Sequence, residues 1–188
     1  IGEILKASFK DLEKQFSKGK VVTGIPSGYI DFDRITGGFH PGSLAILAAR
    51  PSMGKTALAL NIAQHVAIAQ KTPVLIFSLE MGAEQLLLRL LGSEAKVNIH
   101  DMRTGVFPEG AWDELVKAAG TLNEAPIYID DSSFLSTLDL RARARRFKAQ
   151  YPNLGLIIVD YLQLMSLSRR VENKQQEVAE ISKSLKGV

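Results

Sequence analysis

The sequence predicts an α/β fold in which a mainly parallel sheet is flanked by helices. Short apolar runs typical of buried strands alternate along the chain with segments of helical periodicity. Such alternation is typical of parallel strands joined by right-handed crossover helices, with ligands bound at the carboxyl ends of the strands. One of these runs leads into a loop ending in Gly-Lys-Thr at the head of a helix, which is the arrangement of a phosphate-binding loop.

The composition narrows the class of protein. The chain has 188 residues, 46% of them hydrophobic, which is enough for one domain with a real core. The net charge of +3 permits a polyanionic partner. There are no cysteines, which excludes disulfides and thiolate metal sites, and the three histidines are scattered. No signal peptide begins the sequence and no apolar run reaches membrane-spanning length, so we expect a cytoplasmic protein without a membrane partner.

The first 19 residues predict an amphipathic helix. Leu5, Phe9, Leu12 and Phe16 recur at spacings of four, three and four, which places one narrow apolar stripe on a charged helix. The stripe either packs on its own domain or docks on another subunit. Residues 20–188 form the second predicted domain, which opens with turns and a short helix in a stretch rich in glycine and proline, Val21–Gly42.

The core elements of this second domain follow in order. Continuous apolar runs predict four strands, at Leu44–Ala49, Val74–Leu79, Ile127–Ile129 and Leu156–Val159. Helical spacing of apolar residues predicts helices over Thr56–Ala69 and Glu84–Ala95, and further helices marked by Trp112, Leu115, Val116, Ala119 and Leu122, by Leu140, Ala144, Phe147 and Tyr151, and by Val178, Ile181 and Leu185. The last helix is expected to follow a polar loop, 166–172, with Asn173 and Gln176 as a capping box.

The predicted phosphate-binding loop lies between the first strand and its helix. Ser52, Met53 and Gly54 can offer backbone N–H groups, Lys55 an ammonium for the outer phosphates, and Thr56 a hydroxyl for Mg²⁺. The general pattern is G-x-x-x-x-G-K-[ST], and Ala49 stands where its first glycine is expected. A chance Gly-Lys-Thr at a helix start is the alternative.

Two carboxylates end neighbouring strands and are expected to share the crevice with this loop. Asp160 closes the run Leu156–Val159, the Walker B pattern, and can hold Mg²⁺ through water opposite Thr56; otherwise it caps the next turn. Glu80 can orient and deprotonate the attacking water; otherwise it is a favourable charge beside the following helix. Gln163 is a weaker candidate for sensing the γ-phosphate.

Two groups of basic residues receive different interpretations. Arg141, Arg145 and Lys148 share one face of a helix, which favours a solvated surface. Arg169, Arg170 and Lys174 come just after the Walker B strand, where a loop can bind phosphates, so we expect contact with DNA there. A solvated connector is the alternative.

Three stretches carry a family resemblance. TGIPSGYIDFDRITGGFHPGSLAILAARPSMGKTALALNIA, FSLEM (Phe77 to Met81) and LIIVDYLQLM (Leu156 to Met165) resemble the motor domain of bacterial DnaB-type replicative helicases. The resemblance covers essentially the whole chain and implies that residues 1–19 are a linker helix before the motor domain. Alanine in place of the first loop glycine is that family's own version. It implies that Lys55 and Thr56 bind phosphate and Mg²⁺, that Glu80 is the catalytic carboxylate and that Asp160 is the Walker B acid.

The resemblance also implies an architecture and partners. It implies a RecA-like P-loop core, a homohexameric ring that hydrolyses ATP at subunit interfaces, single-stranded DNA in the central channel, and contacts with primase and a helicase loader. The alternatives are a RecA-type recombinase and a nucleotide-dependent assembly module. In this family a sensor strand and an arginine finger lie downstream, so we expect that the natural chain continues past Val188, or that partners hold this piece together. We also expect this piece to hydrolyse little ATP.

Overall fold

The computed structural model describes residues 2, 5, 9, 22–165 and 174–188. The chain divides into two compact units, 1–43 and 44–188. In the first unit the described residues of the predicted linker are helical, and the side chains of Leu5 and Phe9 are exposed. Leu12 and Phe16 lie outside the described residues, so the apolar stripe as a whole stays a prediction.

The rest of the first unit is a short helix held by a buried carboxylate. Helix α2 spans Ile30–Thr36, which confirms the short helix expected in this glycine-rich stretch. The side chain of Asp33 is buried and accepts hydrogen bonds from the backbone N–H groups of Ser27 and Gly28 at 2.8 and 3.2 Å. An antiparallel bridge between Ile25 and Phe39 closes the segment around the helix.

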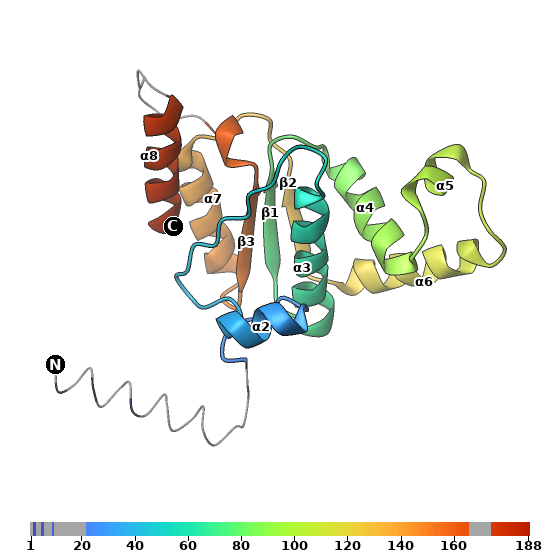
Figure 1. Ribbon diagram of the computed structural model, residues 1–188, viewed down its shortest axis with the longest axis horizontal. Coiled ribbons are helices and arrows are strands. Elements are labelled where there is room, and N and C mark those ends of the chain that lie inside the picture. The colour runs from blue at the N-terminus through green and yellow to red at the C-terminus, as the bar shows by residue number, and fades with distance from the viewer. Residues whose placement is uncertain (1, 3–4, 6–8, 10–21, 166–173) are drawn as a thin grey trace. The chain divides into compact units, whose positions relative to one another are not determined.

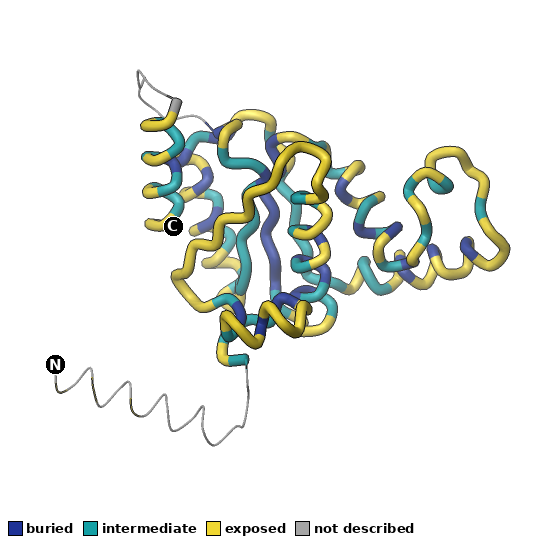
Figure 2. Tube along the Cα trace, viewed as in Figure 1, coloured by how far each residue is buried: buried dark blue, intermediate teal, exposed yellow. Residues whose placement is uncertain are grey.

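The second unit is built on a parallel sheet. Strands β1 (Val74–Ser78), β2 (Ile127–Asp130) and β3 (Leu156–Asp160) lie in the order β2-β1-β3. Val74 is in register with Ile127 on one side and with Leu156 on the other. Three of the four predicted strands are therefore confirmed. The central strand β1 is buried along its whole length, as Figure 2 shows.

The prediction of a strand at Leu44–Ala49 is wrong for this structure. The segment has no regular structure, and Figure 2 shows it exposed along its length. Ile46 is 70% exposed, so the apolar run is not in a core. A strand forms only when a neighbouring strand pairs with its backbone groups, and among the described residues none lies beside this run.

Helices cover both faces of the sheet. Helix α3 (Lys55–Ala69) packs against all three strands, and α7 (Thr137–Gln150) and α8 (Lys174–Lys186) lie on the opposite face (Figure 1). Between the sheet and helices α7 and α8 lies a hydrophobic core cluster. Its buried residues come from the sheet, the helices and the connecting loops: Leu75, Phe77, Leu79, Leu135, Leu140, Ala144, Met165 and Ile181. This arrangement confirms the predicted α/β class.

Three further helices form a separate small cluster. Helices α4 (Ala83–Ala95), α5 (Ile99–Thr104) and α6 (Ala111–Glu124) extend to one side of the sheet in Figure 1. The predicted helix at α6 is confirmed, but Trp112 and Val116 are exposed and the buried side runs through Leu115 and Ala118. The buried contact between α6 and α4 is formed by Leu115 and Ala118 of α6 with Ala95 of α4.

The end of the chain agrees with the prediction where it is described. Helix α8 buries Ile181 completely, with Val178 and Leu185 partly buried beside it. The polar loop 166–172 and Asn173 of the expected capping box lie outside the described residues. No helix in the described parts of the chain is long and apolar enough to cross a bilayer.

Candidate active site

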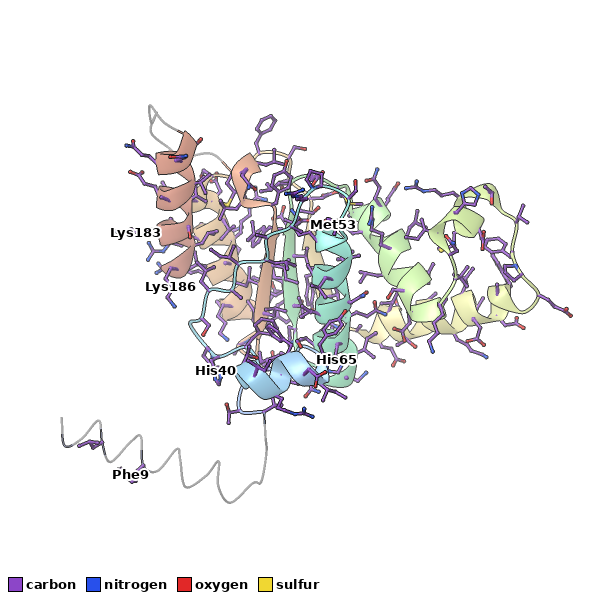
Figure 3. The ribbon with its side chains drawn as sticks, in the orientation of Figure 1. Phe9, His40, Met53, His65, Lys183 and Lys186 are labelled. Atoms are coloured by element: carbon purple, nitrogen blue, oxygen red, sulfur yellow. The ribbon has the colours of Figure 1, made fainter. Side chains whose placement is uncertain are left out.

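The phosphate-binding loop enters α3 through a residue that favours glycine. Gly54, the residue before the helix, has a φ of 85°, in the left-handed region where a side chain is strained. Ser52 also has a positive φ of 64°. Gly54 offers no side chain to the first turn of α3, and Met53, at the loop end of the helix in Figure 3, is 73% exposed. The Met53 N–H donates to the Arg50 carbonyl at 3.3 Å, and the rest of the loop and the first turn of α3 present backbone N–H groups at a positive helix end, as phosphate binding requires.

The two halves of the predicted nucleotide site meet at the carboxylate of Asp160. The Lys55 ammonium lies 2.7 Å from one carboxylate oxygen, and the Thr56 hydroxyl donates to the other at 2.6 Å. The Thr56 and Asp160 side chains come from positions 104 residues apart. They meet because Asp160 ends β3, and helix α3, which packs against the sheet, begins beside that end of the strand.

The environment of this ion pair strengthens it. The side chain of Asp160 is 9% exposed and that of Lys55 is 26% exposed, so water screens the attraction only in part. The Tyr161 ring lies under the ammonium at 4.2 Å, a cation–π contact. The peptide bond between Asp160 and Tyr161 is cis. Sequence reasoning did not find Tyr161; its place directly after the Walker B carboxylate was the available signal.

The same oxygen atoms fit a hard divalent cation. Mg²⁺ prefers carboxylate, hydroxyl and water oxygens, and the Thr56 hydroxyl and Asp160 carboxylate supply the first two within hydrogen-bond distance of each other. His65 lies farther along α3, away from the loop (Figure 3), and among the described residues no three His, Asp or Glu side chains gather into a metal-binding group of their own.

Glu80 lies in the loop that leaves β1 at the same edge of the sheet. Its side chain is exposed, and within the described residues it makes no hydrogen bond or ion pair. The loop itself is tied down. The backbone N–H of Leu79 donates to the Asp160 carbonyl at 2.8 Å, and the Ser78 hydroxyl donates to the Met81 carbonyl at 2.6 Å. The backbone therefore links the loop of Glu80 directly to the Walker B residue.

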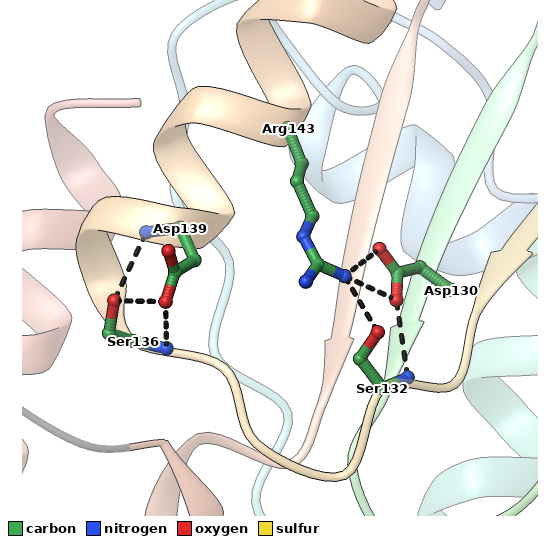
Figure 4. Close-up of polar contacts among 5 residues, drawn as sticks. All are labelled: Asp130, Ser132, Ser136, Asp139 and Arg143. Carbon is green, nitrogen blue, oxygen red and sulfur yellow. Dashed lines mark hydrogen bonds and ion pairs between the residues drawn. The ribbon is translucent and has the colours of Figure 1, made fainter.

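Two adjacent carboxylates that sequence reasoning missed lie where strand β2 ends: Asp130 is its last residue and Asp131 follows it. Asp130 pairs with Arg143 of α7 at 2.7 Å and accepts the backbone N–H of Ser132, as Figure 4 shows. Partial burial raises the pKa of Asp130, but hydrogen bonds from Ser132 and Arg143 outweigh it and hold that pKa below its ordinary value. Asp131 instead turns toward α4 and accepts the N–H of Ala83 at 2.9 Å.

Of the remaining predicted residues, the structure describes Gln163 in full, Lys174 in part, and Arg169 and Arg170 not at all. Gln163 lies in a short 3₁₀ helix, η1 (Leu162–Leu164), and its side chain is exposed. Arg169 and Arg170 lie outside the described residues, and of Lys174 the structure gives the helical backbone at the start of α8.

The basic face of α7 is solvated. Its residues Arg141, Arg145 and Lys148 are exposed, as its interpretation as a solvated surface requires. Arg143, on the same helix, points instead to the sheet and pairs with Asp130 (Figure 4).

Comparison with known proteins identifies the family. Residues 24–188 match the model of the DnaB-like helicase C-terminal domain. The chain belongs to this family. It is 48% identical to the replicative DNA helicase DnaB of Geobacillus stearothermophilus and 47% identical to the replicative DNA helicase DnaC of Bacillus subtilis strain 168, in both cases over all of this chain and 41% of the relative. The chain thus spans about two fifths of the length of these curated relatives.

Solved structures of this family share the fold. A DnaB-like replicative helicase, solved in a study of its interactions with primase, matches with a TM-score of 0.88 and 30% identity, over 100% of this chain and 44% of the other. A second solved structure, of an isolated ATPase domain, matches with a TM-score of 0.91 and 30% identity, over 100% of this chain and 66% of that chain. These likenesses confirm the resemblance to DnaB-type helicase motors and the fold that it implies.

Proposed function

We propose that this chain is the ATP-hydrolysing motor of a replicative DNA helicase. The observation that carries the proposal is the convergence of Lys55, Thr56 and Asp160 at one edge of the sheet, with Glu80 on the adjoining loop. Phosphate-loop and Walker B groups in contact are the arrangement of phosphoryl-transfer sites. The names of the relatives, replicative DNA helicases, favour this function over a recombinase or an assembly module.

The residues take distinct roles in this proposal. Backbone N–H groups of Ser52, Met53 and Gly54 bind the phosphate chain, and Lys55 leaves Asp160 to neutralise charge on the outer phosphates. Thr56 and Asp160, the latter through water, would hold Mg²⁺, which when bound draws charge from the phosphate oxygens.

Hydrolysis then requires a base. The oxygen of a water molecule bonds to the γ-phosphorus as the bond from that phosphorus to the β,γ-bridging oxygen breaks. Glu80 accepts the proton that the water loses. An exposed carboxylate without a partner of its own suits this role, because nothing in the described chain competes for it. Gln163, in η1 just past Asp160, would sense the γ-phosphate.

The proposal includes the assembly and its partners. Six copies form a ring with ATP at their interfaces, single-stranded DNA in the channel is gripped by Arg169, Arg170 and Lys174, and the complete cytoplasmic protein contacts primase and a helicase loader. Residues 1–19 act as a linker helix and 20–188 as the motor domain.

The linker helix offers a test of the assembly. Leu5 and Phe9 are 51% and 62% exposed, so they are available to a neighbouring subunit. Changing both to aspartate should dissociate the ring, because a carboxylate on a buried apolar contact is costly, while helicity and cooperative melting persist. Sedimentation with circular dichroism measures both. Melting lost together with the oligomer would show that the stripe packs on its own domain.

The catalytic assignment is tested by Glu80→Gln in the whole protein. The change preserves the size of the side chain and removes the base, so ATP affinity should stay near that of wild type while phosphate release falls by about 10² to 10⁴-fold. Lys55→Ala is the companion variant and should lose affinity itself. Phosphate release at the wild-type rate from Glu80→Gln would remove Glu80 from the role.

A further inference from the structure

The position of Glu80 depends on its loop rather than on its own contacts. The side chain is exposed and has no hydrogen bond or ion pair within the part of the chain that the structure describes. Two ties hold the loop on the side of β1 and β3, from Leu79 to Asp160 and from Ser78 to Met81. Neither hydrogen bond fixes the other end of the loop, where the chain enters α4.

The anchor for this end of the loop comes from a different strand. The residue before α4 is Gly82, which has an extended backbone and no side chain to cap the helix. The carboxylate of Asp131, 48 residues later at the end of β2, accepts the N–H of Ala83, the first residue of α4, at 2.9 Å. A carboxylate at this helix end accepts a hydrogen bond from a backbone N–H that has no partner within the helix, and its negative charge interacts favourably with the positive end of the helix dipole. Asp131, which follows β2, thus caps the N-terminus of α4 as an N-cap side chain of the helix itself would.

The neighbouring carboxylate is committed elsewhere. Asp130 is held by Arg143 and Ser132 and fixes α7 to the sheet (Figure 4). The two consecutive aspartates therefore serve two different helices, and only Asp131 acts on the loop that carries Glu80.

We propose that Asp131 is a positioning residue for catalysis, which holds the start of α4 so that Glu80 meets the attacking water in a fixed geometry. The inference rests on the catalytic role proposed for Glu80. Glu80 lies three residues before the N–H that Asp131 binds, so releasing that N–H frees the loop on one side. A misplacement of about 1 Å at a reacting group costs up to about 10²-fold in rate.

The first test is Asp131→Ala in the whole protein, measured as steady-state ATP hydrolysis. We expect kcat to fall about 10- to 100-fold with the KM for ATP within about threefold, because the phosphate-binding residues are untouched. Asp131→Asn keeps an oxygen acceptor and should recover most of kcat. Ser136→Ala is the matched control: it removes a comparable cap, in which the Ser136 hydroxyl accepts the Asp139 N–H, from α7, and it should leave kcat unchanged.

A second variant restores the cap from another place. Gly82 has φ −66° and ψ 155°, the usual N-cap conformation, and among the described residues a Cβ there would come within 4 Å of Asp131 alone, at 3.9 Å. Gly82→Ser supplies a local cap, so the double variant Asp131→Ala with Gly82→Ser should regain kcat. It also gives a folded protein for the measurement if Asp131→Ala alone does not melt cooperatively.

The outcomes separate this inference from the function on which it rests. Wild-type kcat in Asp131→Ala, an equal loss in Ser136→Ala, or a double variant that folds but stays slow would each overturn the positioning role. If Glu80→Gln is inactive while Asp131→Ala is normal, the positioning role alone fails. If Glu80→Gln hydrolyses ATP like wild type, the proposed catalytic role fails and takes the positioning role with it.

Discussion

Lys55→Ala should destabilise the folded protein in the absence of nucleotide, apart from its effect on ATP binding. The Lys55 ammonium is 2.7 Å from the Asp160 carboxylate, whose side chain is 9% exposed. Without the ammonium this carboxylate keeps the Thr56 hydroxyl as its hydrogen-bond donor among the described side chains. A buried charge that loses its partner is costly.

The size of the effect follows from the burial of the pair. Exposed ion pairs contribute about 0 to 1 kcal/mol, and removing one partner of a fully buried pair costs about 3 to 5 kcal/mol. The Lys55 side chain is 26% exposed, which places this pair between the two cases. We therefore expect the free energy of unfolding to fall by about 1 to 3 kcal/mol, the usual cost of leaving a buried polar group without its partner.

The assay is urea unfolding of the nucleotide-free whole protein, followed for the domain that contains this chain. Lys117→Ala is the matched control, because Lys117 also lies 2.7 Å from a carboxylate, that of Glu114, but both side chains are largely exposed. Its unfolding curve should overlay that of wild type. In an Asp160→Asn background, Lys55→Ala should cost much less than in wild type. Equal stability of Lys55→Ala and Lys117→Ala would refute the reasoning.

Two further predictions concern acid stability and DNA. Hydrogen bonds and the ion pair hold the pKa of Asp130 below the ordinary 3.8, so this carboxylate contributes stability that is present above about pH 4 and is lost as the pH falls through the lowered pKa. In acid unfolding between about pH 5 and 2.5, Asp130→Asn should therefore lose less stability than wild type. An equal loss in the two proteins would contradict this prediction. Arg169→Ala with Arg170→Ala should weaken single-stranded DNA binding and reduce the slope of log affinity against log salt by up to about 1.4; an unchanged slope in a salt titration would identify a solvated connector.

The sheet and the centre of the site could be predicted because local pattern and topology agree there. The β-branched and aromatic run at Val74–Leu79 has no other stable use than a buried strand. Once the strands are parallel, their carboxyl ends share an edge, and that rule places Asp160 at the edge where Glu80 follows β1. The sequence also predicts that the phosphate-binding loop shares a crevice with Asp160, and in the structure Lys55 and Thr56 contact the Asp160 carboxylate.

Other features depend on tertiary contacts that a local pattern does not carry. Leu44–Ala49 has the composition of a strand, but strand formation depends on a pairing neighbour, and the described residues contain none for it. Helix α5 is only six residues long, too short for an apolar period to reveal; its signals were Asn98, whose side chain accepts the N–H of His100, and Gly105 at its end. The roles of Asp131 and Tyr161 arise from packing between strand ends.

ATP-dependent unwinding of a forked DNA duplex by the whole protein tests the central claim most directly. A fluorescent strand released from the fork reports the rate, with wild type and Glu80→Gln compared at saturating ATP. Wild type should release the strand only with ATP and Mg²⁺, and Glu80→Gln should bind ATP and the fork but release no strand. Strand release by Glu80→Gln at the wild-type rate, or hydrolysis by wild type without any unwinding, would contradict the central claim.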